Sequence, residues 1–152
     1  MRRDERAMAT AEELRAFGAL DIAGVVGLSL AEVRAWLTVG RRKLLEGRLA
    51  AACDILAYAC YLDVAEPVSW ELLAAALLAA GRPREADSAI AAALALEPSW
   101  RRATLAGLCR EAVGEEEEAE RWREEARRLA GGRPEAQEVL RCVFGGEGGE
   151  AP

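Results

Sequence analysis

The sequence predicts an all-α protein built from repeated helix pairs. Its 152 residues include 33 alanines, and leucine, glutamate and arginine are also abundant, a composition that favours helix. β-branched residues are few, which argues against a sheet. Glycines that can end helices, namely Gly47, Gly81 and Gly114, recur at a nearly constant interval of about 34 residues. A single supersecondary unit repeated along the chain explains both the composition and the spacing.

Other residues share the glycine spacing. The pairs at the same interval are Trp36 and Trp70, Ala52 and Ala86, Leu56 and Ile90, Ala59 and Ala93, and Leu62 and Leu96. A third copy follows at almost the same interval, with Ala86 matched by Ala119, Ala93 by Ala126, Leu96 by Leu129 and Ala74 by Gly107. Because tryptophan and glycine are among the matches, an alanine-rich composition does not explain them. We therefore predict three copies of one helix pair.

Capping residues place the ends of the helices. Thr10 and Ser29 are each followed three residues later by a glutamate, which is the spacing of a capping box, so helices should begin directly after both. The repeated glycines suit the left-handed position that follows a helix. Pro134 suits the first turn of a short closing helix. In all, we expect seven or eight helices.

These helix-start and helix-end signals predict four segments. Residues 1–29 form an N-terminal helix and a candidate dimerisation segment, and residues 30–131 form the three repeats. Residues 132–144 form the C-terminal helix, and the glycine-rich residues 145–152 form a flexible tail. The second helix of the third repeat is strongly charged, which is typical of a solvated closing helix. Its expected ion pairs, four residues apart, are Glu117–Arg121 and Glu124–Arg128.

Composition excludes several kinds of function. The net charge of −6 disfavours a phosphate-binding surface, so we expect no nucleic-acid partner. No apolar run approaches the length of about 18 residues that a membrane span needs, so we expect no membrane insertion. The N-terminus carries acidic residues where a signal peptide needs an apolar stretch, so a cytoplasmic location is expected.

The chain has no histidine, which excludes a Cys/His zinc site, a Ser-His or Cys-His nucleophile and a histidine general base. Its cysteines, Cys53, Cys60, Cys109 and Cys142, form no C-x-x-C pair and are expected to be reduced and mostly buried thiols. We therefore predict no enzyme activity, no catalytic residue, no cofactor and no metal.

The second repeat resembles the tetratricopeptide repeat. The family pattern falls on Trp70, Leu73, Ala74, Leu77, Gly81, Ala86, Ile90, Ala93, Leu94 and Pro98. The resemblance implies a tetratricopeptide-repeat superhelix of three antiparallel helix pairs, with an N-terminal helix and a short C-terminal helix. Small residues at family positions let the two backbones approach closely. The third copy departs from the pattern, because Ala103 replaces the tryptophan and Arg123 replaces a large apolar residue.

Residues 18–120 resemble a more specific group, the class II (translocator) chaperones of bacterial type III secretion. The resemblance includes "DIA" at 21–23, "GLS" at 27–29, "ACYLD" at 59–63, and Cys109 followed by "GEEEEAE" at 114–120. It implies a homodimeric chaperone that shields apolar segments of a secreted, hydrophobic translocator client. In that family the first helix of each pair lines a concave groove.

The resemblance places ten residues of this chain in the groove. They are Leu37, Arg41, Leu44, Val68, Glu71, Ala75, Leu78, Thr104, Leu108 and Glu111. The family carries aromatic residues at the positions of the first repeat, where Leu37 and Leu44 are apolar but not aromatic. The expected dimer interface on the N-terminal helix consists of Leu14, Phe17, Leu20, Ile22 and Val25.

Two alternatives stay open. A general tetratricopeptide scaffold for protein–protein interaction shares the fold and the groove and differs only in its client. The other is a helix-turn-helix DNA-binding regulator, because Ala23, Gly27 and Val33 have the motif's spacing and "GRRKL" follows. The acidic composition weighs against it, and the same helix must also serve as the first helix of repeat one.

Overall fold

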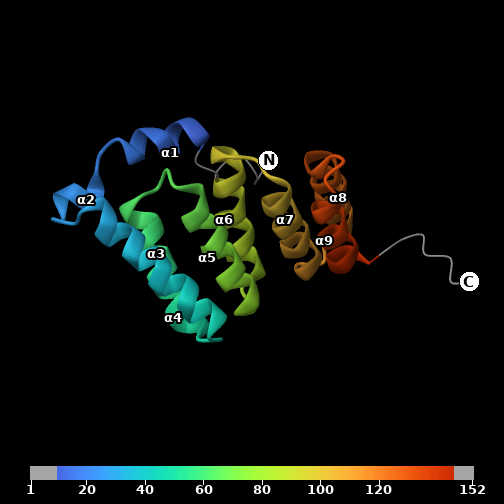
Figure 1. Cartoon of the computed structure of the whole chain (residues 1–152), viewed down its shortest axis with the longest axis horizontal. Helices are drawn as coiled ribbons and strands as arrows, with labels where there is room; N and C mark the ends of the chain where they lie inside the picture. Colours follow the sequence, from blue (N-terminus) through green and yellow to red (C-terminus); the bar gives the residue numbers. More distant parts are fainter. Residues whose placement is uncertain (1–9, 146–152) are drawn as a thin grey trace, which may run out of the picture. The chain divides into compact units, whose positions relative to one another are not determined.

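The structure, a computed structural model, describes residues 10–145, and every regular element in that range is an α-helix (Figure 1). The chain divides into two compact units, Met1–Pro98 and Ser99–Pro152. The first contains α1 (Ala11–Gly18), α2 (Ile22–Val25), α3 (Leu30–Leu45), α4 (Leu49–Leu62), α5 (Pro67–Ala79) and α6 (Pro83–Leu96). The second contains α7 (Trp100–Ala112), α8 (Glu116–Ala130) and α9 (Pro134–Phe144). Apart from Gly145, the expected flexible tail lies outside the described residues.

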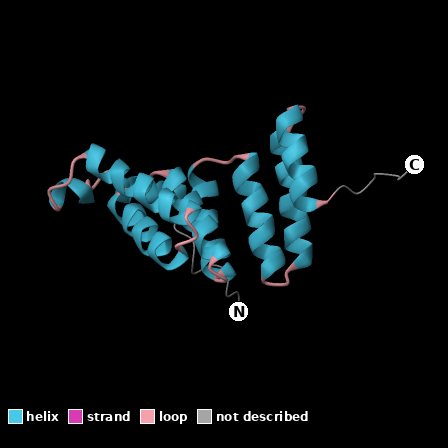
Figure 2. Cartoon of the chain, turned by 60° about the horizontal axis from the view of Figure 1, so that its bottom comes forward, coloured by secondary structure: helices cyan, strands magenta, loops and turns pink. Residues whose placement is uncertain are grey.

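The all-α prediction is confirmed for the described residues, which are drawn as helices and loops alone (Figure 2). Helices α3 and α4, α5 and α6, and α7 and α8 pack in consecutive pairs. Trp36 and Trp70 lie on the first helix of their pairs, as the repeat register predicts. Residues 10–145 form nine helices rather than seven or eight, because the N-terminal segment forms two short helices instead of one.

Both predicted capping boxes are present. The Thr10 hydroxyl accepts a hydrogen bond from the Glu13 amide at 3.1 Å, and the Glu13 carboxylate accepts one from the Thr10 amide at 2.6 Å. Ser29 and Glu32 repeat the arrangement at 3.3 and 2.6 Å. The hydrogen bonds from Ser29 hold the pKa of Glu32 below its usual value. Local hydrogen bonding alone thus sets where α1 and α3 begin.

The three repeated glycines end the first helix of each pair in the same way. Gly47, Gly81 and Gly114 have positive φ angles of 74°, 76° and 83°, a conformation that glycine adopts without steric cost. The residue after each glycine donates its amide to a carbonyl five residues earlier, at 2.9 to 3.0 Å. This 6→1 bond is the Schellman motif. The same turn therefore joins the two helices of every pair.

Small residues let the helices of a pair approach closely. The alanines that repeat along the chain are almost fully buried: Ala52, Ala59, Ala86, Ala93, Ala119 and Ala126 are all 0–1% exposed. At Gly40 of α3, an added Cβ would lie 2.7 Å from two side-chain carbons of Leu56 on α4. The abundance of alanine therefore reflects interhelical distance, and Leu56 and Ile90 fill the remaining volume of the core.

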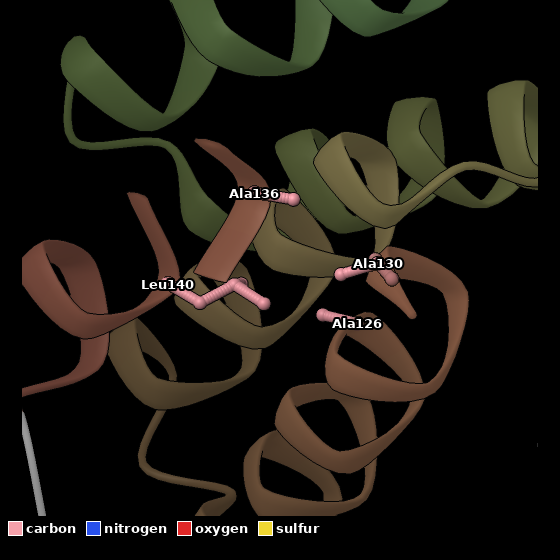
Figure 3. Close-up of a cluster of buried hydrophobic side chains, with 5 residues drawn as sticks. Ala126, Ala130, Ala136 and Leu140 are labelled. Carbon is pink, nitrogen blue, oxygen red and sulfur yellow. The ribbon is translucent and has the colours of Figure 1, made fainter. Parts of the chain in front are cut away.

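The closing helix α9 completes the core of the second unit. Its buried residues Ala136 and Leu140 join Ala103 of α7 and Ala126 and Ala130 of α8 in one apolar cluster (Figure 3). Partly buried tryptophan, leucine and phenylalanine side chains pack around this cluster. A repeat array ends in a helix whose inner face is apolar because the last repeat would otherwise leave its own apolar face in water.

The expectation of one N-terminal helix is wrong in detail. Asp21 has a positive φ of 45°, and its side chain caps α2 by accepting the Gly24 amide at 3.0 Å, so the chain turns between α1 and α2. Helix α1 is held by its own unit. Leu14 is only 6% exposed, and the Arg15 guanidinium donates to the Leu96 carbonyl at the end of α6 at 3.1 Å.

Candidate functional site

On α3, three predicted site residues form one stripe. Leu37, Arg41 and Leu44 are spaced by four and three residues, so they share a helix face. Leu37 and Leu44 are half-buried and Arg41 is exposed. The buried residues Val33 and Gly40 adjoin Leu37 and Leu44 at helical spacing, so the stripe runs along the edge of the buried face of α3. The stripe therefore offers apolar surface that the protein's own packing leaves partly accessible.

Helix α5 carries a second stripe, and α5 contacts α3 directly. Its members are Val68, Glu71, Ala75 and Leu78, spaced by three, four and three residues. All four are half-buried or exposed, with Val68 at 40%. The buried residues of α5 are a different set, namely Ser69, Leu73, Ala74, Ala76 and Leu77. Two neighbouring helices of the first unit therefore each present a partly exposed stripe with apolar members.

The three predicted residues of the second unit behave differently from one another. Thr104 is 7% exposed, and its hydroxyl donates to the Trp100 carbonyl at 2.7 Å. Leu108 is half-buried. Glu111 is exposed, and its carboxylate accepts a hydrogen bond from Arg123 of α8 at 2.9 Å. Of the three, only Leu108 offers a partly accessible apolar side chain.

An open pocket of about 330 Å³ lies in the second unit. It is lined by Trp100, Arg101, Thr104, Leu105, Leu108 and Val139. The sequence identified Thr104 and Leu108 but missed the other four. Leu105 and Trp100 could have been found as the next members of the same α7 face. Val139 could not, because it lies on α9, and only the tertiary packing brings that helix beside α7.

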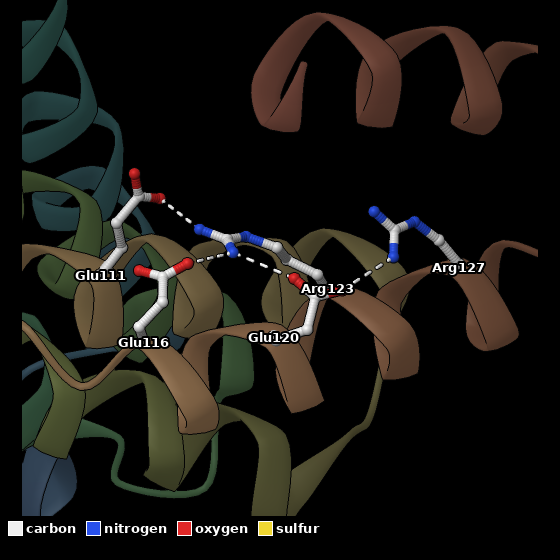
Figure 4. A network of polar contacts seen from close by, with 5 residues as sticks. All are labelled: Glu111, Glu116, Glu120, Arg123 and Arg127. Atoms are coloured by element: carbon white, nitrogen blue, oxygen red, sulfur yellow. Dashed lines mark hydrogen bonds and ion pairs between the residues drawn. The ribbon is translucent and has the colours of Figure 1, made fainter. Parts of the chain in front are cut away.

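Several carboxylates along the first turns of α8 are bound by arginines. Arg123 binds Glu111 on α7 and Glu116 and Glu120 on its own helix, with N–O distances of 2.6 to 3.0 Å, and Arg127 also binds Glu120 (Figure 4). Hydrogen bonds from Arg123 and Arg127 lower the pKa of Glu120. These bonds tie α8 to α7, which agrees with a closing helix.

The two expected ion pairs of α8 are wrong by one residue. Arg121 pairs with Glu118, and Arg128 pairs with Glu125, at three rather than four residues' separation. The Arg128 contact is bidentate, with N–O distances of 2.7 and 2.5 Å. Residues three and four apart both lie on one helix face, and at the shorter spacing the guanidinium engages both carboxylate oxygens.

The predicted dimer residues divide into two groups. Phe17, Leu20 and Val25 are 55%, 62% and 82% exposed, so a partner could cover them. Ile22 is half-buried. Leu14 is buried within its own unit, so the expectation that it faces a partner is corrected: packing of α1 already covers it.

Two further expectations concern α3 and the cysteines. Helix α3 packs along α4, and the rings of Trp36 and Tyr58 meet edge to face at 5.5 Å, so α3 serves as the first helix of a repeat pair. Cys53, Cys60 and Cys109 are buried thiols and Cys142 is an exposed one, as expected. Burial raises the pKa of Cys60, which keeps it protonated.

In the part of the chain that the structure describes, no single helix is long and apolar enough to cross a membrane. One sharply bent pair of segments, Ala11–Val25 with Leu30–Leu45, is long and apolar enough for a membrane span, judged by length and composition only.

Several solved structures with the same fold are of type III secretion proteins, and another is the first TPR of Spaghetti (RPAP3) bound to an HSP90 peptide. A chain of a T3SS complex from Aeromonas hydrophila aligns with a TM-score of 0.76 and 24% identity, over 88% of this chain and 91% of that one. The translocator chaperone SycD of Yersinia enterocolitica was solved as an alternative dimer and with a peptide of the translocator YopD. Both structures align with a TM-score of 0.72 and 21% identity, over 76% of this chain and 89% of that one. PcrH in complex with the chaperone binding region of PopB aligns with a TM-score of 0.71 and 21% identity, over 78% of this chain and 96% of that one.

No protein-family model matches the chain, and no curated protein matches it either. The structural likeness nevertheless confirms the fold class predicted from the repeat register, an all-α tetratricopeptide-repeat fold. It also confirms, at the level of fold, the resemblance to translocator chaperones.

Proposed function

We propose that this protein is a cytoplasmic binding chaperone that shields apolar segments of a secreted, translocator-type client. The observation that carries the proposal is the pair of partly exposed stripes on α3 and α5, where Leu37, Leu44 and Leu78 stay accessible although the chain has a well-packed core. Structures of the same fold support it, because SycD and PcrH were solved with segments of translocators.

The mechanism is burial without turnover. A segment destined for a membrane exposes apolar side chains that would associate in water. Laying it on the stripes removes apolar surface from water at about 25 cal/mol per Å² before ordering costs. Each leucine-sized contact then contributes roughly 1–2 kcal/mol to binding. Such a function requires no general base, metal or cofactor, and the absence of histidine is compatible with it.

A second copy of the chain is the proposed partner of the N-terminal segment. Among the described residues, nine of the twelve exposed large apolar side chains lie on or between α1 and α4, and Phe17, Leu20 and Val25 are among them. Phe17, Leu20 and Val25, each more than half exposed, are the side chains that a second copy would cover. A homodimer is supported by the SycD structure of the same fold, which is described as an alternative dimer.

The test begins with capture of the client from the source cell on the tagged protein, followed by mass spectrometry. The captured segment is then titrated by calorimetry into Leu44→Asp and, as a matched control, Leu45→Asp. Leu45 is the next residue of the same helix, is 79% exposed and does not belong to the stripe. Leu44→Asp should weaken binding at least tenfold because it places a charge where an apolar side chain docks. Leu45→Asp should bind like the wild type.

Other outcomes decide between the alternatives. Unchanged affinity of Leu44→Asp would remove the α3 stripe from the site. A collapse of its melting temperature would show that Leu44 belongs to the core. A polar client without apolar segments would favour a general tetratricopeptide scaffold. Sequence-dependent DNA binding that Arg41→Glu abolishes in a mobility-shift assay would favour the helix-turn-helix alternative.

A further inference from the structure

The pocket between α7 and α9 has the size and lining of a side-chain subsite. Its volume of about 330 Å³ lies at the lower end of ligand pockets, which run from about 300 to 1,000 Å³. Trp100, Leu105 and Leu108 of α7 supply one apolar wall, and Val139 of α9 supplies another. Val139 remains 43% exposed although Leu140 beside it is buried. The pocket is therefore open and lined mostly by apolar side chains, as a site for an aliphatic side chain requires.

Polar groups in the lining are few. The hydroxyl of Thr104 already donates to the Trp100 carbonyl at 2.7 Å, so the threonine does not need a ligand to satisfy it. This leaves the guanidinium of Arg101 as the charged group of the lining. A ligand that fills the pocket consequently meets apolar atoms on most sides and one cation.

Arg101 lies over an aromatic ring at the edge of the pocket. Its guanidinium carbon lies 5.2 Å from the centroid of the Trp100 ring, an arrangement typical of a cation–π contact, and the side chain is exposed. Within residues 10–145 no carboxylate pairs with it. Arg123, Arg128 and Arg141, by contrast, each bind a glutamate. Arg101 thus retains a planar, bidentate donor face for a carboxylate from outside the chain.

We propose that this pocket is a client subsite that takes a large aliphatic side chain, with an acidic residue next to it in the client bound by Arg101. The inference rests on the proposed function, since it names the chemistry of the segment that the chaperone selects. It goes beyond apolar burial, because an apolar surface alone would not distinguish an acidic neighbour from a basic one. Stacking on Trp100 holds the guanidinium beside the pocket. An acidic client residue is therefore favoured only where it lies next to the side chain that fills the pocket.

Defined peptides test the subsite without the natural client. The probes are three capped heptapeptides of serine and glutamine that carry Leu-Glu, Leu-Lys or Ala-Glu at the centre. Binding is followed by the indole Nε1–H resonance of Trp100 in the ¹⁵N-labelled full chain, which has four tryptophans. The resonance is assigned by its loss in Trp100→Phe. The Leu-Glu peptide should shift it, and the other two should bind at least fivefold more weakly.

Two variants and a matched control sharpen the test. Val139→Asp should weaken the Leu-Glu peptide at least fivefold, while Val143→Asp should not, because Val143 lies on the same helix with similar exposure, 39%, and does not line the pocket. Arg101→Glu should reverse the preference so that the Leu-Lys peptide binds more tightly. This reversal does not depend on Val139→Asp folding.

The proposal is overturned if the Leu-Glu peptide leaves the Trp100 resonance unmoved at millimolar concentration. Equal losses in Val139→Asp and Val143→Asp, or an unchanged charge preference in Arg101→Glu, would also overturn it. Failure of the proposed function is distinguishable from these outcomes. If the captured client binds normally to Val139→Asp and Arg101→Glu, the subsite is refuted while the chaperone function stands. If the peptides bind the pocket as expected but no apolar client is captured, the chaperone function is refuted while the preference of the pocket for an aliphatic side chain beside an acidic one stands.

Discussion

Replacing Gly40 by alanine should destabilise the protein, although alanine is the better helix former. Gly40 lies inside α3, where alanine improves helix propensity by about 1 kcal/mol. The new methyl group, however, would lie 2.7 Å from both Cγ and Cδ2 of Leu56 and 3.3 Å from Cγ2 of Ile55. Leu56 is 0% exposed, so it has no free space into which to turn. Overpacking of this kind costs about 1–3 kcal/mol, which outweighs the gain in propensity.

Gly107 provides the matched control. It occupies the equivalent position of the third repeat, inside α7, and is also buried. A Cβ there would meet the Ala119 carbonyl oxygen and Phe144 at 3.5 Å, an ordinary van der Waals distance. Gly107→Ala should therefore be neutral or stabilise the protein by up to about 1 kcal/mol. Comparing Gly40→Ala with Gly107→Ala separates the cost of packing from the gain in helix propensity, because both substitutions make the same change at equivalent repeat positions.

Thermal and urea unfolding, both followed by circular dichroism, measure the two variants. Gly40→Ala should lower the melting temperature by about 2–4 °C per kcal/mol lost, and Gly107→Ala should not lower it. Combining Gly40→Ala with Leu56→Ala should cost less than the sum of the two single changes, because the second removes the atoms that the new methyl strikes. The reasoning is refuted if Gly40→Ala is as stable as the wild type, or if the double variant is strictly additive.

Three further predictions concern caps, charge and assembly. Ser29→Ala removes one half of the α3 capping box and should cost about 1 kcal/mol in urea unfolding, whereas Ser88→Ala, an exposed serine inside α6, should cost less. The pKa of Glu120 is lowered in the folded state, so its contribution to stability is present above its unfolded pKa of about 4.3 and is lost as the pH falls through the lower folded value. Arg123→Met should therefore flatten the decline of stability below about pH 5, and an unchanged acid profile would contradict this assignment. Phe17→Glu should shift micromolar protein from dimer to monomer in sedimentation without altering helicity, and a wild-type monomer would count against the proposed interface.

Local features of the fold could be predicted from the sequence alone. The capping boxes at Thr10 and Ser29 depend on hydrogen bonds between residues three apart, and both are present. The glycine turns after α3, α5 and α7 depend on a single residue's conformational freedom, and all three are present. The repeat register extends these local rules along the chain, because each pair repeats the same contacts with its own members. These interactions need no knowledge of what lies across the fold.

Resemblance supplied the candidate site, and packing altered it. The stripe on α3 stays accessible, but Glu111 is bound by Arg123 and Leu14 is covered by its own unit. Helical periodicity places a side chain on a face, yet it does not say which neighbour that face meets. Ion pairs such as Arg128–Glu125 likewise depend on side-chain conformers, which charge spacing describes only approximately.

By itself, the sequence determined that the chain is helical, where several helices begin and end, and that three similar pairs follow one another. Only the tertiary structure decided that Asp21 breaks the N-terminal segment, that Gly40 touches Leu56, and that Val139 completes a pocket with α7. The reason is physical: caps and turns are made by hydrogen bonds within a few residues of the chain. Close packing depends instead on the shapes of side chains distant in sequence, and these meet only when the helices have docked.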